Sequence, residues 1–334
     1  MRKKIKWAIV GLGSQAERIA EAIHVSRNSV LTAAADISAK RVKEFAGNFN
    51  VGESFNTFDK LLTNSGANAV FIASPNYLHA AQSISALNAK KHVLCEKPMC
   101  LSLKEALSVK KAVKKNNVKF GVGFHLRFHP VLREVKKIIQ SGKTGEVVFA
   151  EMHWSIGDAG ETKMTALPGH KLWRENMSQS GGGSLMARGV HLFDLLRFIL
   201  GRDIDDACSL SDRCSKKSVD QLTAGVMRAG DIFATIATSR KIPFSLNRII
   251  IYGSRGRLLA PESFNTDGTG ILEVNIMGKK SVKKFTKKTN LYKEEIENFS
   301  DAILKNKKWF GADINDGLKS VRATEAWSKF TQSI

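Results

Sequence analysis

A short glycine turn between an apolar segment and a helical segment constrains the fold of this chain most strongly. Residues 5–10 form an apolar run, and Gly11-Leu12-Gly13-Ser14-Gln15-Ala16 follows it directly. Glycine at such a turn lets the backbone approach a pyrophosphate, whose charge is favoured by the positive end of the following helix. The G-x-G-x-x-A spacing therefore predicts the first strand, turn and helix of a dinucleotide-binding fold.

Strand-like and helix-like segments alternate over the first 120 residues. Further strands are expected over 30–35, 69–73, 92–95 and 118–122. Helices are expected over 16–25, 39–48, 77–89 and 103–116, with Ser38 as the N-cap of the second. Repeated β-α units of this length are typical of a parallel sheet covered by helices on both faces.

The pattern changes after Gly123. A helix over 131–139 and a strand over 146–154 precede a loop over 155–180 and a helix that begins after Gly181–Gly183. Further strands are expected over 206–210, 218–228, 231–240, 248–252, 257–259 and 271–277, and closing helices over 293–305 and 318–330. We expect an α/β Rossmann domain over 1–123 with a parallel doubly wound sheet. An α+β domain over 124–334 would hold a large, mostly antiparallel open sheet.

The net charge of the 334-residue chain is +21, which raises the question of an anionic partner. The lysines are spread over expected helix faces, strand edges and turns, without interleaved aromatic residues, and this favours a solvated surface over a nucleic-acid site. No apolar run approaches the length of a membrane span, and the four cysteines form no C-x-x-C pair. We expect a cytoplasmic protein with small buried thiols. No cluster has metal-ligand spacing, so no metal is expected.

Asp36 lies at the end of the second expected strand, twenty residues beyond Ala16. A carboxylate there can accept hydrogen bonds from the adenosine ribose and repels a 2′-phosphate, which favours NAD. Arg41, one turn into the next helix, could tolerate a phosphate or cover the adenine, so NADP is left open.

Two short motifs follow the next two strands, at the carboxyl edge where ligands bind in such sheets. The first is Ser74-Pro75-Asn76-Tyr77-Leu78-His79, which could equally be a simple helix-initiating turn. The second is Glu96-Lys97-Pro98. Lys97 would place a cation where an alkoxide develops during hydride transfer, although three residues alone fit a surface salt bridge as well.

The helix after Gly181–Gly183 carries a histidine away from its apolar stripe. Leu185, Leu192, Leu196 and Ile199 fall on one side at 3.6 residues per turn, whereas Ala187, His191 and Asp194 share another. His191 is therefore a candidate proton-transfer group. The alternative is a histidine packed in the core.

In this order and over nearly the whole chain, the four motifs resemble those of the glucose-fructose oxidoreductase / inositol dehydrogenase (Gfo/Idh/MocA) family. The resemblance implies a sugar substrate held between the two domains, with Lys97 near the nicotinamide and the reacting hydroxyl, and His191 moving the hydroxyl proton. The expected cofactor-binding residues are Gly11, Leu12, Gly13, Ser14, Gln15, Asp36, Arg41, Ser74, Asn76, His79, Glu96, Lys97, Trp173 and Arg174. The expected substrate residues are Lys97, Arg174, Arg188, His191 and Asp194.

Ala187 departs from this resemblance, because members with the full pattern have aspartate there. Its absence, together with Arg188 three residues before His191, should favour a neutral imidazole that can accept a proton. Asp194 could orient the ring instead, and Arg188 or Arg174 could face an anionic part of the substrate. The alternative function is a catalytically inactive cofactor-binding regulator. The family likeness also implies a homodimer or homotetramer built on the open sheet.

Overall fold

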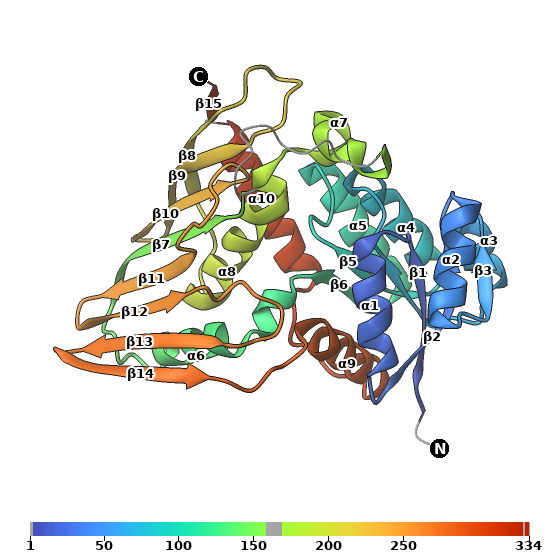
Figure 1. The fold of residues 1–334 in the computed structure, drawn as a ribbon, viewed down its shortest axis with the longest axis horizontal. Coiled ribbons are helices and arrows are strands. Elements are labelled where there is room, and N and C mark those ends of the chain that lie inside the picture. Colours follow the sequence, from blue (N-terminus) through green and yellow to red (C-terminus); the bar gives the residue numbers. More distant parts are fainter. Residues whose placement is uncertain (1–2, 158–168, 330, 334) are drawn as a thin grey trace. The chain divides into compact units, whose positions relative to one another are not determined.

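The computed structural model describes residues 3–157, 169–329 and 331–333, which divide into two compact units (Figure 1). The first unit contains residues 1–125 and 290–318, and the second contains residues 126–289 and 319–334. The expected boundary after Gly123 lies two residues before the end of the first segment. Residues 290–318, which we expected in the second domain, return instead to the first unit.

The first unit is built on a six-stranded parallel sheet in the order β3-β2-β1-β4-β5-β6. Its strands are β1 (Ile5–Val10), β2 (Ser29–Ala35), β3 (Glu53–Phe55), β4 (Ala69–Ile72), β5 (His92–Glu96) and β6 (Phe120–Gly123). Its helices are α1 (Ser14–His24), α2 (Ala39–Phe49), α3 (Phe58–Asn64), α4 (His79–Asn88), α5 (Leu103–Asn116) and α9 (Leu291–Leu304). Helix α1 packs with α2 and α9, and α4 packs with α5 (Figure 1). The expected doubly wound Rossmann architecture is confirmed.

Helix α9 belongs to this unit because it covers residues of β1 and β2. The Trp7 indole Nε1 donates to Ser300 Oγ at 3.1 Å, and the ring centroids of Trp7 and Phe299 lie 5.7 Å apart. The Asn28 amide donates to the Glu297 carbonyl oxygen at 2.9 Å. Trp7 and Phe299 are fully buried, so this helix completes the core of the first unit.

The second unit holds a nine-stranded sheet in the order β14-β13-β12-β11-β7-β10-β9-β8-β15. Its strands are β7 (Val147–Ser155), β8 (Asp206–Ser211), β9 (Leu222–Ala229), β10 (Ile232–Ser239), β11 (Arg248–Gly253), β12 (Gly256–Pro261), β13 (Gly270–Ile276), β14 (Lys279–Phe285) and β15 (Thr331–Ser333). Among the described strand pairs of this nine-stranded sheet, only β7–β10 and β8–β15 are parallel, which confirms the expected mostly antiparallel sheet. Helices α6 (Pro130–Gln140) and α8 (Val190–Leu200) pack together on one side of it (Figure 1).

Several elements differ from the sequence-based expectation. Strands β3, β14 and β15 and helix α3 were not expected, and the expected loop over 155–180 contains a 3₁₀ helix (Gly169–Glu175) and α7 (Met177–Ser180) in its described part. Residues 158–168 of that loop lie outside the described residues. The closing helix, α10 (Ile314–Lys329), begins four residues early because Asp313 Oδ1 accepts from the backbone N–H groups of Asn315 and Asp316. The remaining expected elements lie within four residues of the observed bounds.

The segment after the glycines is not a simple amphipathic α-helix. Leu185–Gly189 form a π-helical turn, and α8 begins only at Val190. Every residue from Val190 to Ile199 is buried. The side of the helix that carries His191 and Asp194 is therefore buried, as is the apolar stripe.

Candidate functional site

The glycine turn between β1 and α1 is shaped for close approach of a ligand. Gly11 has a φ of +84°, and a Cβ there would lie 2.5 Å from the Ser74 backbone nitrogen. A Cβ on Gly13 would meet nothing within 4 Å, and no side chain caps the helix that begins at Ser14. Open space beside uncapped helix N–H groups is what a pyrophosphate requires, so the turn fits a dinucleotide.

Asp36 is buried at the carboxyl end of β2 and already has several partners. Its Oδ2 accepts from the Leu12 backbone N–H at 2.8 Å, and its Oδ1 accepts from the Ser38 N–H at 2.8 Å. Arg41 donates to the same Oδ1 at 2.7 Å through Nη2 and at 3.2 Å through Nε. A ribose hydroxyl would thus share Asp36 with a guanidinium group, and this pairing was not anticipated.

His79 connects two of the expected motifs. One ring nitrogen lies 2.8 Å from the Ser74 carbonyl oxygen and the other lies 2.7 Å from the Pro98 carbonyl oxygen. Burial lowers the pKa of His79 despite these two acceptors. The histidine was expected to line the cofactor cleft, but its ring ties the turn after β4 to the residues after β5. Asn76 and Ser74 are buried in the same turn.

Glu96 and Lys97 follow one another at the carboxyl end of β5. Glu96 is buried, and its Oε2 accepts from the Lys97 backbone N–H at 3.1 Å. Burial raises the pKa of Glu96 to about 7, although Lys97, Gln15 and Arg18 act in the opposite direction.

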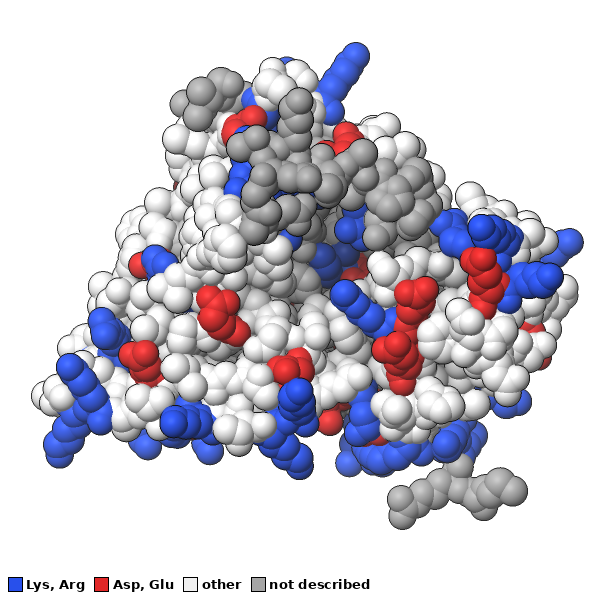
Figure 2. Space-filling view, in the orientation of Figure 1, with Lys and Arg blue, Asp and Glu red and all other residues white. Residues whose placement is uncertain are grey.

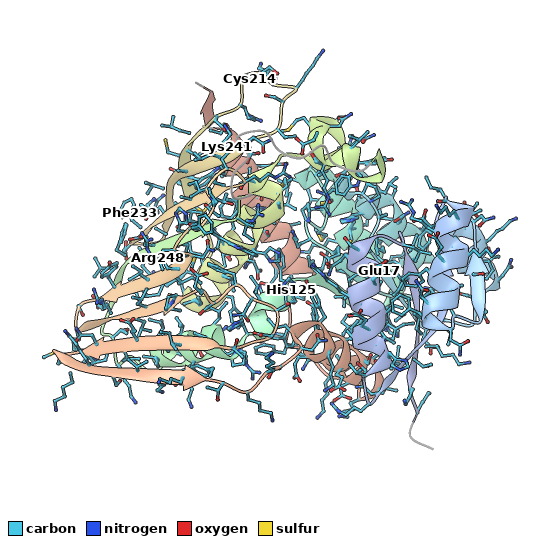
Figure 3. The ribbon with its side chains drawn as sticks, in the orientation of Figure 1. Glu17, His125, Cys214, Phe233, Lys241 and Arg248 are labelled. Atoms are coloured by element: carbon cyan, nitrogen blue, oxygen red, sulfur yellow. The ribbon has the colours of Figure 1, made fainter. Side chains whose placement is uncertain are left out.

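Tyr292, at the start of α9, adds a group that sequence reasoning did not place in the site. Burial and the Glu96 carboxylate raise the pKa of Tyr292, and its ring centroid lies 4.5 Å from that of His125 (Figure 3 labels His125). The sequence signal was weak, because Tyr292 lies about 200 residues after Glu96 along the chain.

In the second unit, Asp220 holds the glycine segment and the π-helical turn. Its two carboxylate oxygens accept from the backbone N–H groups of Gly183 and Leu185, each at 2.7 Å, and its carbonyl oxygen accepts from Ser184 N–H at 2.9 Å. A Cβ on Gly183 would lie 1.8 Å from that carbonyl oxygen. Sequence reasoning missed Asp220, because no local pattern links it to residues 37 positions earlier.

His191 is buried, with 3% of its surface exposed, and its ring lies beside that of Trp154. Its ring centroid lies 5.5 Å from that of Trp154, which stacks on Phe264 at 4.7 Å. Asp194, expected to contact substrate or orient His191, forms a buried two-point ion pair with Arg127, at 2.8 and 2.6 Å. Arg127 therefore gives Asp194 a structural partner.

Three arginines of the second unit, called the arginine cluster below, are Arg174, Arg188 and Arg240. Arg174 lies in the last turn of the 3₁₀ helix, with its guanidinium carbon 5.4 Å from the ring centroid of Trp173. Arg240 follows β10 and donates to Glu175 at 2.9 Å. Burial lowers the pKa of Arg188 to about 10, and the cations Arg240 and Arg174 act in the same direction.

Charge on the face shown in Figure 2 is distributed in small groups, with Asp and Glu among the Lys and Arg. Within the described parts of the chain, no group of three His, Cys, Asp or Glu side chains could hold a metal ion. No described helix is both long and apolar enough to cross a bilayer. Cys95 and Cys100 are buried as expected, whereas Cys208 and Cys214 are exposed.

The comparisons with known proteins agree with this architecture. Residues 5–124 match "Oxidoreductase family, NAD-binding Rossmann fold", and residues 132–259 match "GFO/IDH/MocA C-terminal domain". The 1,5-anhydro-D-fructose reductase of Ensifer adhaerens is 26% identical over 304 residues, which are 89% of this chain and 88% of that protein. The glucose-6-phosphate 3-dehydrogenase of Bacillus subtilis (strain 168) is 32% identical over 199 residues, 59% of this chain and 54% of that protein.

A solved structure extends the likeness over both units. Scyllo-inositol dehydrogenase from Lactobacillus casei, with bound NAD(H) and scyllo-inositol, has a TM-score of 0.81 at 25% identity and covers 98% of this chain and 97% of its own. The glycine turn, the sheet order and these matches define an NAD(P)-dependent oxidoreductase. The chain belongs to the Gfo/Idh/MocA family, as its motifs implied.

Proposed function

We propose that this enzyme transfers a hydride between nicotinamide and a CH–OH carbon of a sugar or polyol, with Lys97 and His191 handling the hydroxyl proton. The names of its relatives refer to an anhydrofructose, a glucose phosphate and an inositol, which supports this class of substrate.

The chemistry follows from the side chains that the chain supplies. When bound, the nicotinamide dinucleotide accepts or supplies the hydride. Lys97 Nζ would donate a hydrogen bond to the reacting oxygen and stabilise its negative charge. His191 would accept the proton during oxidation and return it during reduction. The turn of Gly11 and Gly13 would hold the pyrophosphate.

The observation that carries the proposal is the place of Lys97, directly after β5. Strands β1, β4 and β5 are parallel neighbours, so Lys97 follows the same sheet edge at which the glycine turn leaves β1. The bridge through His79 fixes the residues after β4 and β5 relative to one another. Because ligands bind at this edge in such sheets, the position of Lys97 is suitable for contact with a bound nicotinamide.

Turnover measurements test the assignment. The purified protein is incubated with NAD or NADP and a panel of polyols, aldoses and sugar acids, and absorbance of the reduced cofactor is followed. Lys97→Met and His191→Asn should each lower kcat by about 10²- to 10⁴-fold. Lys104→Met and His24→Asn, on exposed helix positions, are the matched controls. Unchanged turnover in His191→Asn, or tight cofactor binding without turnover of any substrate, would contradict the proposal.

We also propose that a second copy of the chain covers the open face of the nine-stranded sheet. This face exposes the apolar side chains of Leu210, Val226 and Phe233 from three adjacent strands (Figure 3 labels Phe233). Contiguous exposed apolar surface of this kind marks a protein interface. Sedimentation velocity should show a dimer or tetramer that Phe233→Glu dissociates and Leu246→Glu, in a loop, leaves intact. A monomeric wild-type protein would refute this.

A further inference from the structure

We propose that the arginine cluster of Arg174, Arg188 and Arg240 is a subsite for an oxyanion, a phosphate or carboxylate, carried by the substrate. This inference rests on the proposed function, because it names the chemical class of the sugar that the same enzyme would take.

The three residues come from separate elements of one unit. Arg174 lies in the last turn of the 3₁₀ helix Gly169–Glu175, Arg188 lies in the π-helical turn, and Arg240 follows directly after β10. Lys241, labelled in Figure 3, marks this end of β10. The charges that lower the pKa of Arg188 are those of Arg240 and Arg174. Like charges that converge from three elements repel one another, and an anion bound among them, in addition to the Glu175 carboxylate that pairs with Arg240, would offset this repulsion.

Arg188 is the residue that most needs such a partner. Its Nε is buried, and no hydrogen-bond acceptor reaches this atom from the described residues. Burial and the two neighbouring cations lower its pKa to about 10, which reflects the cost of holding its charge there. A buried guanidinium N–H without an acceptor is costly, and a planar oxyanion matches the guanidinium fork with two parallel bonds.

The other two arginines are held in place around it. The Arg240 guanidinium is oriented by Glu175, whose Oε1 accepts from Nη1 at 2.9 Å, and only 15% of the Arg240 side chain is exposed. The Arg174 guanidinium lies 5.4 Å from the Trp173 ring centroid, within the range of a cation–π contact. Orientation before binding lowers the entropy cost of anion capture.

The position of Arg188 also suits an anchor for a reacting sugar. It lies three residues before His191, in the turn that Asp220 ties down through Gly183 and Leu185. Ala187, its neighbour, adds no carboxylate that would compete for the guanidinium. An oxyanion held by Arg188 would therefore fix the substrate relative to the proposed base.

Anion binding can be measured without turnover. Wild-type protein saturated with NAD, so that its pyrophosphate site is filled, is titrated at constant ionic strength with inorganic phosphate, glucose 6-phosphate, gluconate and glucose. Thermal shift and calorimetry report binding. We expect glucose 6-phosphate or gluconate to bind at least tenfold more tightly than glucose. Arg188→Met should weaken anion binding by about tenfold to hundredfold, whereas Arg257→Met, on an exposed strand position, should not.

The variants and substrates keep two failures apart. If Arg188→Met does not fold, Arg240→Gln and Arg188→Lys provide the same comparison. Equal binding of charged and neutral sugars in wild type, or anion binding unchanged in Arg188→Met, overturns the subsite. If neutral sugars are oxidised in that case, the subsite is still refuted, but the proposed function is not. Arginine-dependent binding of the phosphorylated or carboxylated sugar without any turnover upholds the subsite and refutes the proposed function. Binding of inorganic phosphate that is insensitive to all three variants indicates adventitious ion binding and also overturns it.

Discussion

Replacing Asp220 with asparagine should destabilise the second unit and weaken the site that the π-helical turn carries. Asp220 is 3% exposed and accepts from two buried backbone N–H groups, those of Gly183 and Leu185, each at 2.7 Å. Asparagine keeps one acceptor oxygen, but its NH₂ group would face the second N–H. One charge-assisted hydrogen bond is thereby lost and one buried donor is left without an acceptor.

The cost follows from these two effects. A hydrogen bond to a charged group contributes about 1.5–3 kcal/mol, and an unsatisfied buried donor costs about 1–3 kcal/mol. Since the two overlap, we expect the free energy of unfolding to fall by about 2–4 kcal/mol. Asp205→Asn is the matched control, because Asp205 accepts from Gly230 N–H at the same 2.7 Å but at an exposed site. That change should cost below about 1 kcal/mol.

Urea unfolding followed by circular dichroism measures the loss of stability, and steady-state kinetics measure the effect on the site. We expect Asp220→Asn to raise KM and lower kcat at temperatures where the variant is fully folded, because the turn bearing Arg188 is no longer fixed. Asp205→Asn should leave both constants unchanged. If Asp220→Asn unfolds at the wild-type urea concentration and has wild-type kinetics, Asp220 does not position this turn.

Three further changes test other parts of the structure. Burial raises the pKa of Glu96 from 4.5 to about 7, so the free energy of unfolding of the wild type should fall by roughly 3 kcal/mol as the pH rises through this window. Urea unfolding at pH 5 and pH 8 should show this fall in the wild type and not in Glu96→Gln. The same pH dependence in both proteins would refute the role of Glu96. Arg41→Ala should release Asp36 and raise KM for NADP severalfold without raising KM for NAD; equal changes for both cofactors would contradict this. Gly183→Ala should lower the free energy of unfolding by several kcal/mol, since its Cβ would overlap a carbonyl oxygen. Gly47→Ala, at an open position in α2, should instead stabilise the protein by about 0.5–1 kcal/mol. Similar thermal unfolding of the two variants would disprove the overlap.

The Rossmann half could be predicted well because its signals are local. The glycine turn follows β1 directly, and Ser38 caps α2 through the Arg41 N–H, three residues away. Each β-α unit carries its own start and stop signals. Strand β3 has only three residues, too few for a periodic pattern to emerge.

Other features depend on contacts between distant residues. Strand β14 carries four lysines in seven mostly exposed residues, so nothing in its own sequence favours a strand, and only pairing with β13 forms it. Its lysines protect the sheet edge against further pairing. Asp194 pairs with Arg127, which lies 67 residues away. Helical spacing alone placed Asp194 beside His191, and no spacing rule could reveal the ion pair.

The return of α9 to the first unit has a consequence for synthesis of the protein. Trp7 in β1 precedes its partner Ser300 by nearly three hundred residues along the chain. During translation the cofactor-binding unit cannot bury that indole until the whole intervening segment, 126–289, has left the ribosome. Strands β7 to β14 can therefore pair before α9 is made, whereas β15 and Trp327, which also belong to the second unit, follow only after α9. The cofactor-binding unit is thus completed only after most of the second unit has been synthesised.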